Sequence, residues 1–447
     1  MSASYFQDLL GSIAERGRAL IERSGEWSAC SPERGGALGE SGPAGIEALC
    51  RDLLSGRGEA SGVALARRLL DLYGRGPDAD RLAFFHLLAR DFGPDRAQIG
   101  AAWADYDAAP TPPHLQALLR AVEPPRQELF RRLNLAPGGT AGLVGMRADL
   151  LRLGGDDPEL ASVDDDLAHL LSSWFNRGFL VLRHIDWSTP ADILERIIRY
   201  EAVHEIQGWD DLRRRVQPAD RRCFAFFHPS MIDEPLIFVE VALTREIPGS
   251  IQALLAEERA TVPASEARTA VFYSISNCQP GLRGVSFGNF LIKQVVEELS
   301  RELSSLATFV TLSPVPGFAR WLAGRGADPQ LAPGWQRDAA AAEQARAQLL
   351  PLAASYFLAA KGPGGKPVDP VARFHLGNGA RLERLNWLGD ISAKGLREAH
   401  GLMVNYLYDL RFIEANHEAF ANHGTVVTST AVRRQMPASQ PATEMVG

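Results

Sequence analysis

The stretch QPGLRGVSFGNFLIKQVVEELSREL, residues 279–303, places a glycine-rich segment just before a run of apolar residues at helical spacing. The glycines are Gly281, Gly284 and Gly288, and the β-type run TAVFYSIS (269–276) comes before them. Glycines let a backbone approach a ligand closely, and a helix start offers unpaired N–H groups and partial positive charge. The strand, loop and helix therefore predict a phosphate-binding loop or, alternatively, a turn whose glycines only permit tight packing.

The spacing of these glycines excludes two common phosphate-binding motifs. A Walker loop needs G-x-x-x-x-G-K-[ST], but Gly284 and Gly288 are too close and Asn289 follows. The dinucleotide fingerprint G-x-G-x-x-G is also absent. The segment does resemble the Q/R-x-x-G-x-G/A loop with which acetyl-CoA-binding N-acetyltransferases grip the CoA pyrophosphate. Arg283 and Gly288 match that loop, whereas Ser286 replaces its middle glycine.

The composition is that of a soluble globular protein. The 447 residues suffice for two or three domains, with 46% hydrophobic and 23% charged residues. The net charge of −7 gives no general basic surface for nucleic acid, so an anionic ligand needs local arginines. No apolar run approaches the roughly 20 residues of a membrane span. The cysteines show neither a C-x-x-C pair nor metal-ligand spacing, which indicates a reducing compartment: Cys30, Cys50, Cys223 and Cys278.

The chain changes texture near Trp174. Residues 1–173 are rich in alanine, leucine and arginine at helical spacing, which predicts an all-α N-terminal domain of antiparallel helices for packing or oligomerisation. Residues 174–447 carry several β-rich runs with helical stretches between them, which predicts a mixed α/β domain. We therefore expect an α+β protein with the glycine loop in its second domain.

Two residues of the second domain are candidates for chemistry. The strand after the glycine helix is expected to end in LSPVPGF (312–318), where prolines stop it and leave Ser313 at its C-terminal end, the end that faces the ligand in open α/β sheets. His375 lies between Phe374 and Leu376, just before a GNG turn. Each also has a structural interpretation, Ser313 as a capping serine and His375 as a core histidine. No G-x-S-x-G or HExxH motif is present, so neither a hydrolase triad nor a zinc site is predicted.

Several long ordered blocks make the chain resemble the malonyl-CoA decarboxylase family over nearly all of residues 174–420. They include DWSTPADILERI, RRCFAFFHP, EPLIFVEVALT, DPVARFHLGNGA and the opening stretch. The resemblance implies a catalytic domain with the CoA-dependent acetyltransferase fold after a helical domain. It places the family's catalytic serine on Ser313 and its catalytic histidine on His375. Its CoA loop falls on Arg283, Gly284, Val285, Ser286, Phe287, Gly288 and Asn289.

The resemblance also implies a reaction, malonyl-CoA to acetyl-CoA and CO2, in which the thioester carbonyl accepts the electron pair. No metal or cofactor beyond the CoA of the substrate is then expected. His375 is expected to protonate the enolate carbon, and Ser313 either orients His375 or holds the carboxylate. Backbone N–H groups between Ser274 and Ser276 are candidate donors to the thioester oxygen. The rival histidines are His184, His204, His228 and His400.

The N-terminal half carries no catalytic constellation, and its apolar helical stripes exceed what one small bundle needs. We therefore predict that it mediates a homo-oligomer, a dimer or tetramer. The segment between Ser313 and His375 is shorter than in animal relatives. A Ser-Lys-Leu ending is absent, and this absence favours a cytoplasmic enzyme of bacterial type. Three alternatives remain open on the same scaffold. The first two are an acyltransferase and a thioesterase. The third is a CoA-binding regulator without activity, although the presence of both Ser313 and His375 counts against it.

Overall fold

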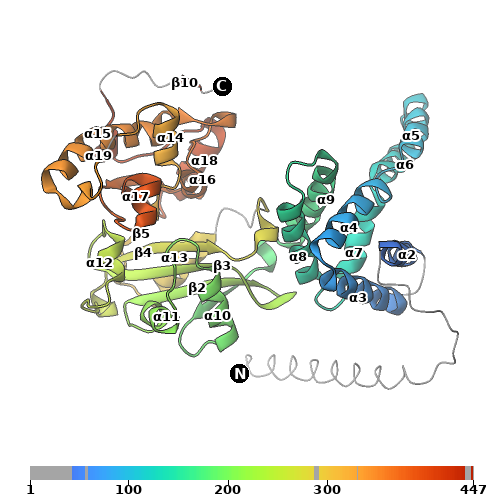
Figure 1. Ribbon diagram of the computed structural model, residues 1–447, viewed down its shortest axis with the longest axis horizontal. Helices are drawn as coiled ribbons and strands as arrows, with labels where there is room; N and C mark the ends of the chain where they lie inside the picture. The colour runs from blue at the N-terminus through green and yellow to red at the C-terminus, as the bar shows by residue number, and fades with distance from the viewer. Residues whose placement is uncertain (1–42, 56–58, 286–290, 330, 438–443, 446–447) are drawn as a thin grey trace. The chain divides into compact units, whose positions relative to one another are not determined.

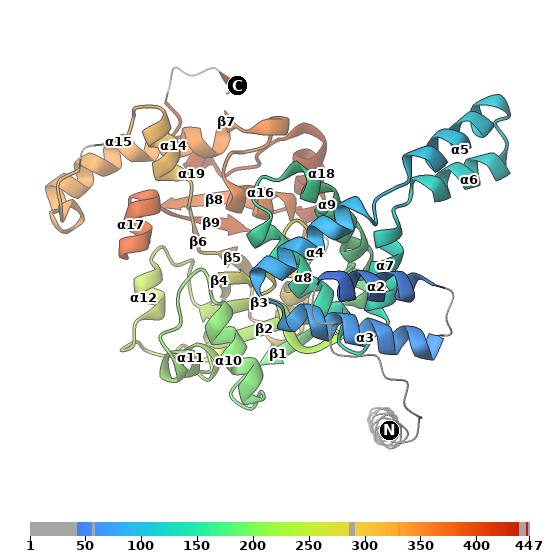
Figure 2. The ribbon, with the colours of Figure 1, turned by 45° about the vertical axis from the view of Figure 1, so that its right-hand side comes forward.

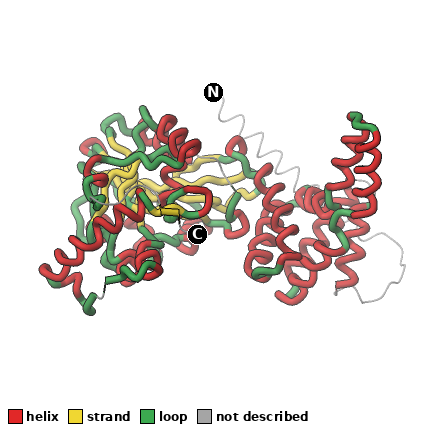
Figure 3. The backbone as a smooth tube through the Cα atoms, turned by 90° about the horizontal axis from the view of Figure 1, so that it is seen from above, coloured by secondary structure: helices red, strands yellow, loops and turns green. Residues whose placement is uncertain are grey.

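The computed structural model describes residues 43–55, 59–285, 291–329, 331–437 and 444–445. Residues Leu49–Gly447 form one compact unit. The described residues before 175 form helices joined by loops, drawn red and green in Figure 3. Helices α2 to α9 have the bounds Pro43–Leu54, Glu59–Arg75, Asp78–Arg90, Arg96–Ala108, Pro112–Val122, Pro125–Asn134, Gly139–Leu153 and Pro158–Trp174. The predicted domain boundary near residue 174 stays a prediction.

The strands of the second part form a mixed sheet of order β1-β2-β3-β4-β5-β9-β6, with β8 paired to β9 (Figure 1). Pairing is antiparallel except between β4 and β5, whose parallel register runs from Thr269↔Thr308 to Phe272↔Thr311. A separate parallel pair joins β7 and β10. The strands β1 to β10 have the bounds Val181–Ile185, Arg221–His228, Met231–Thr244, Thr269–Asn277, Thr308–Thr311, Ser313–Pro314, Ala360–Lys361, Arg381–Asn386, Met403–Leu407 and Glu444–Met445.

Helices cover both faces of this sheet. On one face α10 and α11 bury Ile193, Ile197 and Leu212 against Phe227 of β2 and its neighbours (Figure 1). On the other face α13 is part of the main hydrophobic core. Helix α16 contacts both β8 and α18 (Figure 2). Helices α10 to α19 have the bounds Ala191–Tyr200, Trp209–Val216, Ile251–Leu255, Leu291–Glu302, Phe318–Gly324, Ala339–Leu358, Pro370–Gly377, Ala393–Ala399, Ile413–His423 and Thr430–Arg433.

The order of strand, loop and helix predicted from the opening stretch is confirmed, whereas its role in binding phosphate stays a prediction. The run 269–276 forms β4, the loop carries the short 3₁₀ helix η3 (Pro280–Leu282), and α13 begins its described part at Leu291. Along α13 the apolar stripe is buried in the core that also holds Val239 and Phe272 of the sheet. Helices in the first part and a mixed sheet with helices in the second confirm the predicted fold class.

The sheet opens beside the loop. β4 pairs with β5 only as far as Phe272, so its remaining residues, 273–277, have no β5 partner on that edge. A register irregularity between β3 and β4 lies at the same point, between Glu240 and Val241. Ser313 was expected at the C-terminal end of the strand after the glycine helix, and that strand, β5, ends two residues earlier, at Thr311. The chain continues after Leu312 as β6, in which Ser313 and Pro314 pair with β9.

Across the described residues, no helix combines the length and the apolar character that crossing a membrane requires.

Candidate active site

Two adjoining cavities lie at the opening of the sheet. The smaller, of about 260 Å³, contains Ser313 and His375 in its wall. The larger, of about 490 Å³, extends along the glycine loop at Arg283. The two cavities have three lining residues in common, Ile237, Asn277 and Phe374. A ligand that occupies the larger cavity can therefore reach Ser313 and His375 with its other end.

Ser313 and His375 meet in the wall of the smaller cavity. The Ser313 Oγ lies 3.2 Å from His375 Nε2, and the two side chains are almost fully buried. His375 is held there because α16 begins at Pro370, where the Asp369 carboxylate accepts the Ala372 N–H and caps the helix. The Asp369 carboxylate also accepts the hydroxyl of Tyr356, at 3.0 Å. The helix start is thus fixed against the core, and its second turn presents the imidazole to Ser313.

The hydrogen-bond directions around this pair assign the imidazole proton. Thr311 Oγ1 accepts the Tyr406 N–H at 3.1 Å and the Ser313 hydroxyl at 2.8 Å. Because Ser313 donates to Thr311, its oxygen is an acceptor for His375 Nε2–H. The other ring nitrogen, Nδ1, then accepts the Tyr408 hydroxyl, at 2.7 Å. The assigned tautomer carries its proton on Nε2, on the side of Ser313.

Burial sets the charge of this site. It lowers the pKa of His375 to about 3, so the imidazole is neutral near pH 7. Burial also raises the pKa of Tyr408 well above its usual value, so its hydroxyl keeps its proton. The ring of Tyr406 stacks on the imidazole, with ring centroids 4.6 Å apart. The site therefore holds a neutral, rigidly oriented imidazole N–H.

The described part of the predicted CoA loop lies at the larger cavity. Arg283, Gly284 and Val285 line it, and Gly284 has φ of 80°, a conformation that favours glycine. Ser286, Phe287, Gly288 and Asn289 lie outside the described residues. Arg373 of α16 lines the same cavity, and its Nη1 donates to the carbonyls of Pro367 and Val368. Sequence reasoning missed Arg373, since no local pattern distinguishes it from other surface arginines.

Ser274 and Ser276 lie on β4, but their side chains turn away from the cavity. Both hydroxyls donate to the carboxylate of Glu201, at 2.7 and 3.3 Å. The residues between and beyond them, Ile275 and Asn277, line the smaller cavity instead. A role for this strand as donor must therefore come from its backbone N–H groups, and that part stays a prediction.

The rival histidines line neither of these two cavities. His228 packs on Phe175, and His400 pairs with Asp328 at 3.0 Å. His184 lies on the edge strand β1 within 3.6 Å of Asp186, and burial lowers the pKa of His204 to about 4. Of the five histidines considered, His375 is the one beside Ser313.

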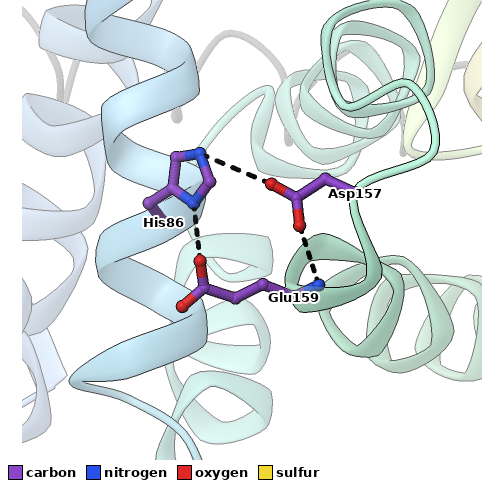
Figure 4. Close-up of side chains that lie close together, drawn as sticks. All are labelled: His86, Asp157 and Glu159. Atoms are coloured by element: carbon purple, nitrogen blue, oxygen red, sulfur yellow. Dashed lines mark hydrogen bonds and ion pairs between the residues drawn. The ribbon is translucent and has the colours of Figure 1, made fainter.

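A group of side chains with metal-binding chemistry lies in the helical part, where the sequence predicted none. His86 of α4 approaches Asp157 and Glu159 at the start of α9 (Figure 4). These groups already have other partners. Glu159 accepts Nε and Nη2 of Arg90 at 2.7 and 2.9 Å, and Asp157 accepts the Glu159 N–H as the helix cap. A guanidinium on the same carboxylate opposes a cation, so we interpret the group as ion pairs that fasten α4 to α9.

Comparison with known proteins gives the family. The family model "Malonyl-CoA decarboxylase C-terminal domain" matches residues 178–446, and the corresponding N-terminal domain matches residues 92–175. A curated relative from Rattus norvegicus, "Malonyl-CoA decarboxylase, mitochondrial", is 35% identical over 442 residues, covering 88% of this chain and 86% of the relative. The corresponding protein of Anser anser anser is 36% identical over 397 residues, 78% of each chain.

Solved structures agree with this. The crystal structure of malonyl-CoA decarboxylase from Rhodopseudomonas palustris is 57% identical and superposes with a TM-score of 0.85, covering 88% of this chain and 99% of that one. The Agrobacterium vitis protein gives 57% identity, a TM-score of 0.83 and the same coverage. The match spans both the helices and the sheet that holds the two cavities. The chain belongs to the malonyl-CoA decarboxylase family.

Proposed function

We propose that this protein decarboxylates malonyl-CoA to acetyl-CoA and CO2. The observation that carries the proposal is the buried Ser313–His375 pair at one end of two adjoining cavities whose other end is the glycine loop. An acyl-CoA thioester matches this arrangement, because its CoA phosphates and its acyl group lie at opposite ends of the molecule. Membership of the family supports the same substrate and product.

The lining of the smaller cavity favours loss of CO2. Among its described residues it contains no Asp, Glu, Lys or Arg, and most of its wall is apolar. A malonyl carboxylate that enters this cavity loses its hydrating water to an apolar wall, which raises its free energy. The CO2 that leaves is neutral and has no such cost. The negative charge moves to the thioester oxygen as an enolate. Backbone N–H groups on the edge of β4 beyond its pairing with β5 are suited to receive it, each contributing about 3–4 kcal/mol in comparable oxyanion sites.

The proton for the α-carbon comes from His375 Nε2. A neutral imidazole is a weak acid, but a thioester enolate is a strong base, and neutral imidazole serves as the electrophile in another enolate-forming enzyme. Transfer of the Nε2 proton leaves an imidazolate, which the Tyr408 hydroxyl stabilises by donating to Nδ1. A proton from water restores Nε2–H before the next turnover. Ser313, fixed by Thr311, holds the imidazole in the plane that faces the acyl group. In this account Ser313 orients His375.

The reaction needs no cofactor, because the thioester carbonyl itself accepts the electron pair. The CoA phosphates are proposed to bind Arg283 on the loop and Arg373 on α16, which line the larger cavity together. Arg373 keeps Nη2 and Nε for a ligand while carbonyl contacts hold its Nη1. Because the net charge of the chain is −7, this local pair is what favours an anion here.

We further propose a homo-oligomer formed through the helical part, and a cytoplasmic location. Helices α5 and α6 contain no buried residue, although they carry the exposed apolar side chains Trp103, Leu115, Leu119 and Val122. A second copy of the chain is the occupant that would bury these side chains. The location is supported by cysteine usage typical of a reducing compartment.

Product analysis tests the activity. The purified protein, treated with EDTA and then with avidin, should convert malonyl-CoA to equal amounts of acetyl-CoA and CO2. Neither treatment should lower the rate, because neither metal nor biotin takes part. Free CoA with malonate as the main products would contradict decarboxylation and indicate a thioesterase. Loss of activity with EDTA that returns with added metal would contradict the cofactor-free mechanism.

A further inference from the structure

A buried arginine of the helical part contacts the backbone of the CoA loop directly. Arg147 lies on α8 and is only 4% exposed. Its Nη1 donates to the carbonyl oxygens of Gly281 and Arg283, each at 2.8 Å. These two carbonyls flank Leu282, and that of Arg283 immediately precedes Gly284. A single guanidinium from a distant helix thus fixes the stretch of chain that leads into the larger cavity.

A carboxylate on the neighbouring helix fixes this guanidinium in turn. Asp164 of α9 accepts Arg147 Nε at 2.8 Å and Nη2 at 3.2 Å. The paired, two-point contact sets the plane of the guanidinium, so Nη1 can point only toward the loop. The helices therefore present a preset donor to the two carbonyls.

The packing of Gly281 brings the loop against α8. A Cβ at this position would lie 1.9 Å from the Val144 carbonyl oxygen and 3.1 Å from the Ala148 nitrogen. No side chain fits there, so the backbones of the loop and of α8 touch. Gly281 is accordingly a packing glycine, whereas Gly284, with its positive φ and open surroundings, is free to approach a ligand.

From these contacts we infer that α8 is a positioning element of the CoA site and that Arg147 is its positioning residue. This inference rests on the proposed function, because it assumes that Arg283 and Gly284 face the CoA phosphates. Arg283 has an exposed side chain on a backbone whose carbonyl is fixed by Arg147. A loop held in its binding conformation loses less entropy when the ligand binds. The helical part therefore contributes to substrate affinity as well as to any oligomer.

The test compares substrates with and without the phosphates. Arg147→Met removes the donors to Gly281 and Arg283 and the pair with Asp164. The KM for malonyl-CoA is expected to rise about tenfold or more, while kcat changes less than about threefold. The KM for malonyl-pantetheine, which lacks the nucleotide phosphates, should stay within about twofold. The Kd for CoA alone, measured by calorimetry, should rise by about the same factor as the KM for malonyl-CoA.

A matched control separates positioning from folding. Arg126 has the same 4% exposure and a similar pair with Asp166, but its other contacts, Leu88 and Ser162, lie inside the helical part. Arg126→Met should lower the melting temperature without changing the ratio of the two KM values. If Arg147→Met does not fold, Arg147→Lys and Asp164→Asn should raise the same ratio by smaller factors.

Equal losses for both substrates, or no loss of CoA affinity in folded Arg147 variants, would overturn the inference. Failure of the proposed function would look different. The wild-type protein would then not decarboxylate malonyl-CoA, and the comparison of CoA affinities between wild type and variants would still decide the role of Arg147.

Discussion

His375 combines deep burial with a complete set of hydrogen-bond partners, and this combination separates it from an ordinary core histidine. An ordinary core histidine has hydrogen-bond partners on its ring nitrogens but does not line a cavity. His375 has Tyr408 on Nδ1 and Ser313 on Nε2, and it also lines a cavity. The hydroxyls of Thr311 and Tyr408 decide which ring nitrogen carries the proton. The chemistry therefore depends on two residues without any local motif.

The variant His375→Asn tests the acid at this scale. Asparagine keeps a similar size and a donor but cannot transfer a proton, so kcat should fall about 10²-fold or more. The Kd for CoA, measured by calorimetry, should stay nearly unchanged because the phosphates bind elsewhere. Ser313→Ala should also lose rate, and the double variant should be little worse than the poorer single one. His400→Asn, which alters a histidine outside both cavities, serves as the control.

Near-normal turnover in His375→Asn would contradict the assignment. Losses that multiply fully in the double variant would show that Ser313 and His375 act separately, which would favour Ser313 as a contact of the carboxylate.

At the scale of elements, strand β3 carries a buried acid beneath the active site. Glu240 is 0% exposed, and its partner Arg215 of α11 lies 3.3 Å away. Burial, together with the nearby Glu201, raises the pKa of Glu240 to about 8. The folded protein therefore keeps a proton that the unfolded chain releases near pH 4.5. Stability from this group is full below about pH 4.5 and declines as the pH rises toward 8.

The variant Glu240→Gln removes this pH dependence. The amide mimics the protonated acid, so the melting temperature of the variant relative to wild type should be higher at pH 8 than at pH 5. Thermal unfolding at both values measures the difference. Glu302→Gln, at the exposed last residue of α13, is the control and should show no such trend. A Glu240→Gln effect that is equal at both values would show that Glu240 is ionised throughout.

The sequence predicted the elements of the site better than their contacts. The residues of the run 269–276, predicted to form a strand, form β4 with one residue added. Its β-branched and aromatic residues carry that information locally. The pairing of His375 with Ser313 came from resemblance to a family. Tyr408 and Arg147 were missed because their partners are 33 and more than 130 residues away, and no periodicity records such a contact.

At the scale of the whole molecule, we propose different roles for α8 and for the pair α5 and α6 of the helical part. Helix α8 contacts the loop through Arg147, whereas α5 and α6 bury no side chain of their own. Two short helices that pack mainly on each other are marginally stable in water. A contact with a second copy of the chain would bury their apolar residues and stabilise them.

Replacing Leu119 and Val122 by Glu tests that contact. Both side chains are exposed on α6, so the change leaves the fold intact but places charges in the proposed interface. Light scattering should show fewer subunits per particle than in wild type. Gln116→Glu, a charge on the same helix, is the control. An unchanged subunit count in the double variant would exclude the pair of helices α5 and α6 as the interface.

The most direct test of the central claim is the reaction in D2O. An enolate that takes its proton from an exchangeable site such as His375 Nε2 should give acetyl-CoA with one deuterium per acetyl group, in step with CO2 release. Mass spectrometry of the product measures this label. The account predicts a single deuterium in the wild type and the same label, formed far more slowly, in His375→Asn. Malonate and free CoA without labelled acetyl-CoA would contradict it.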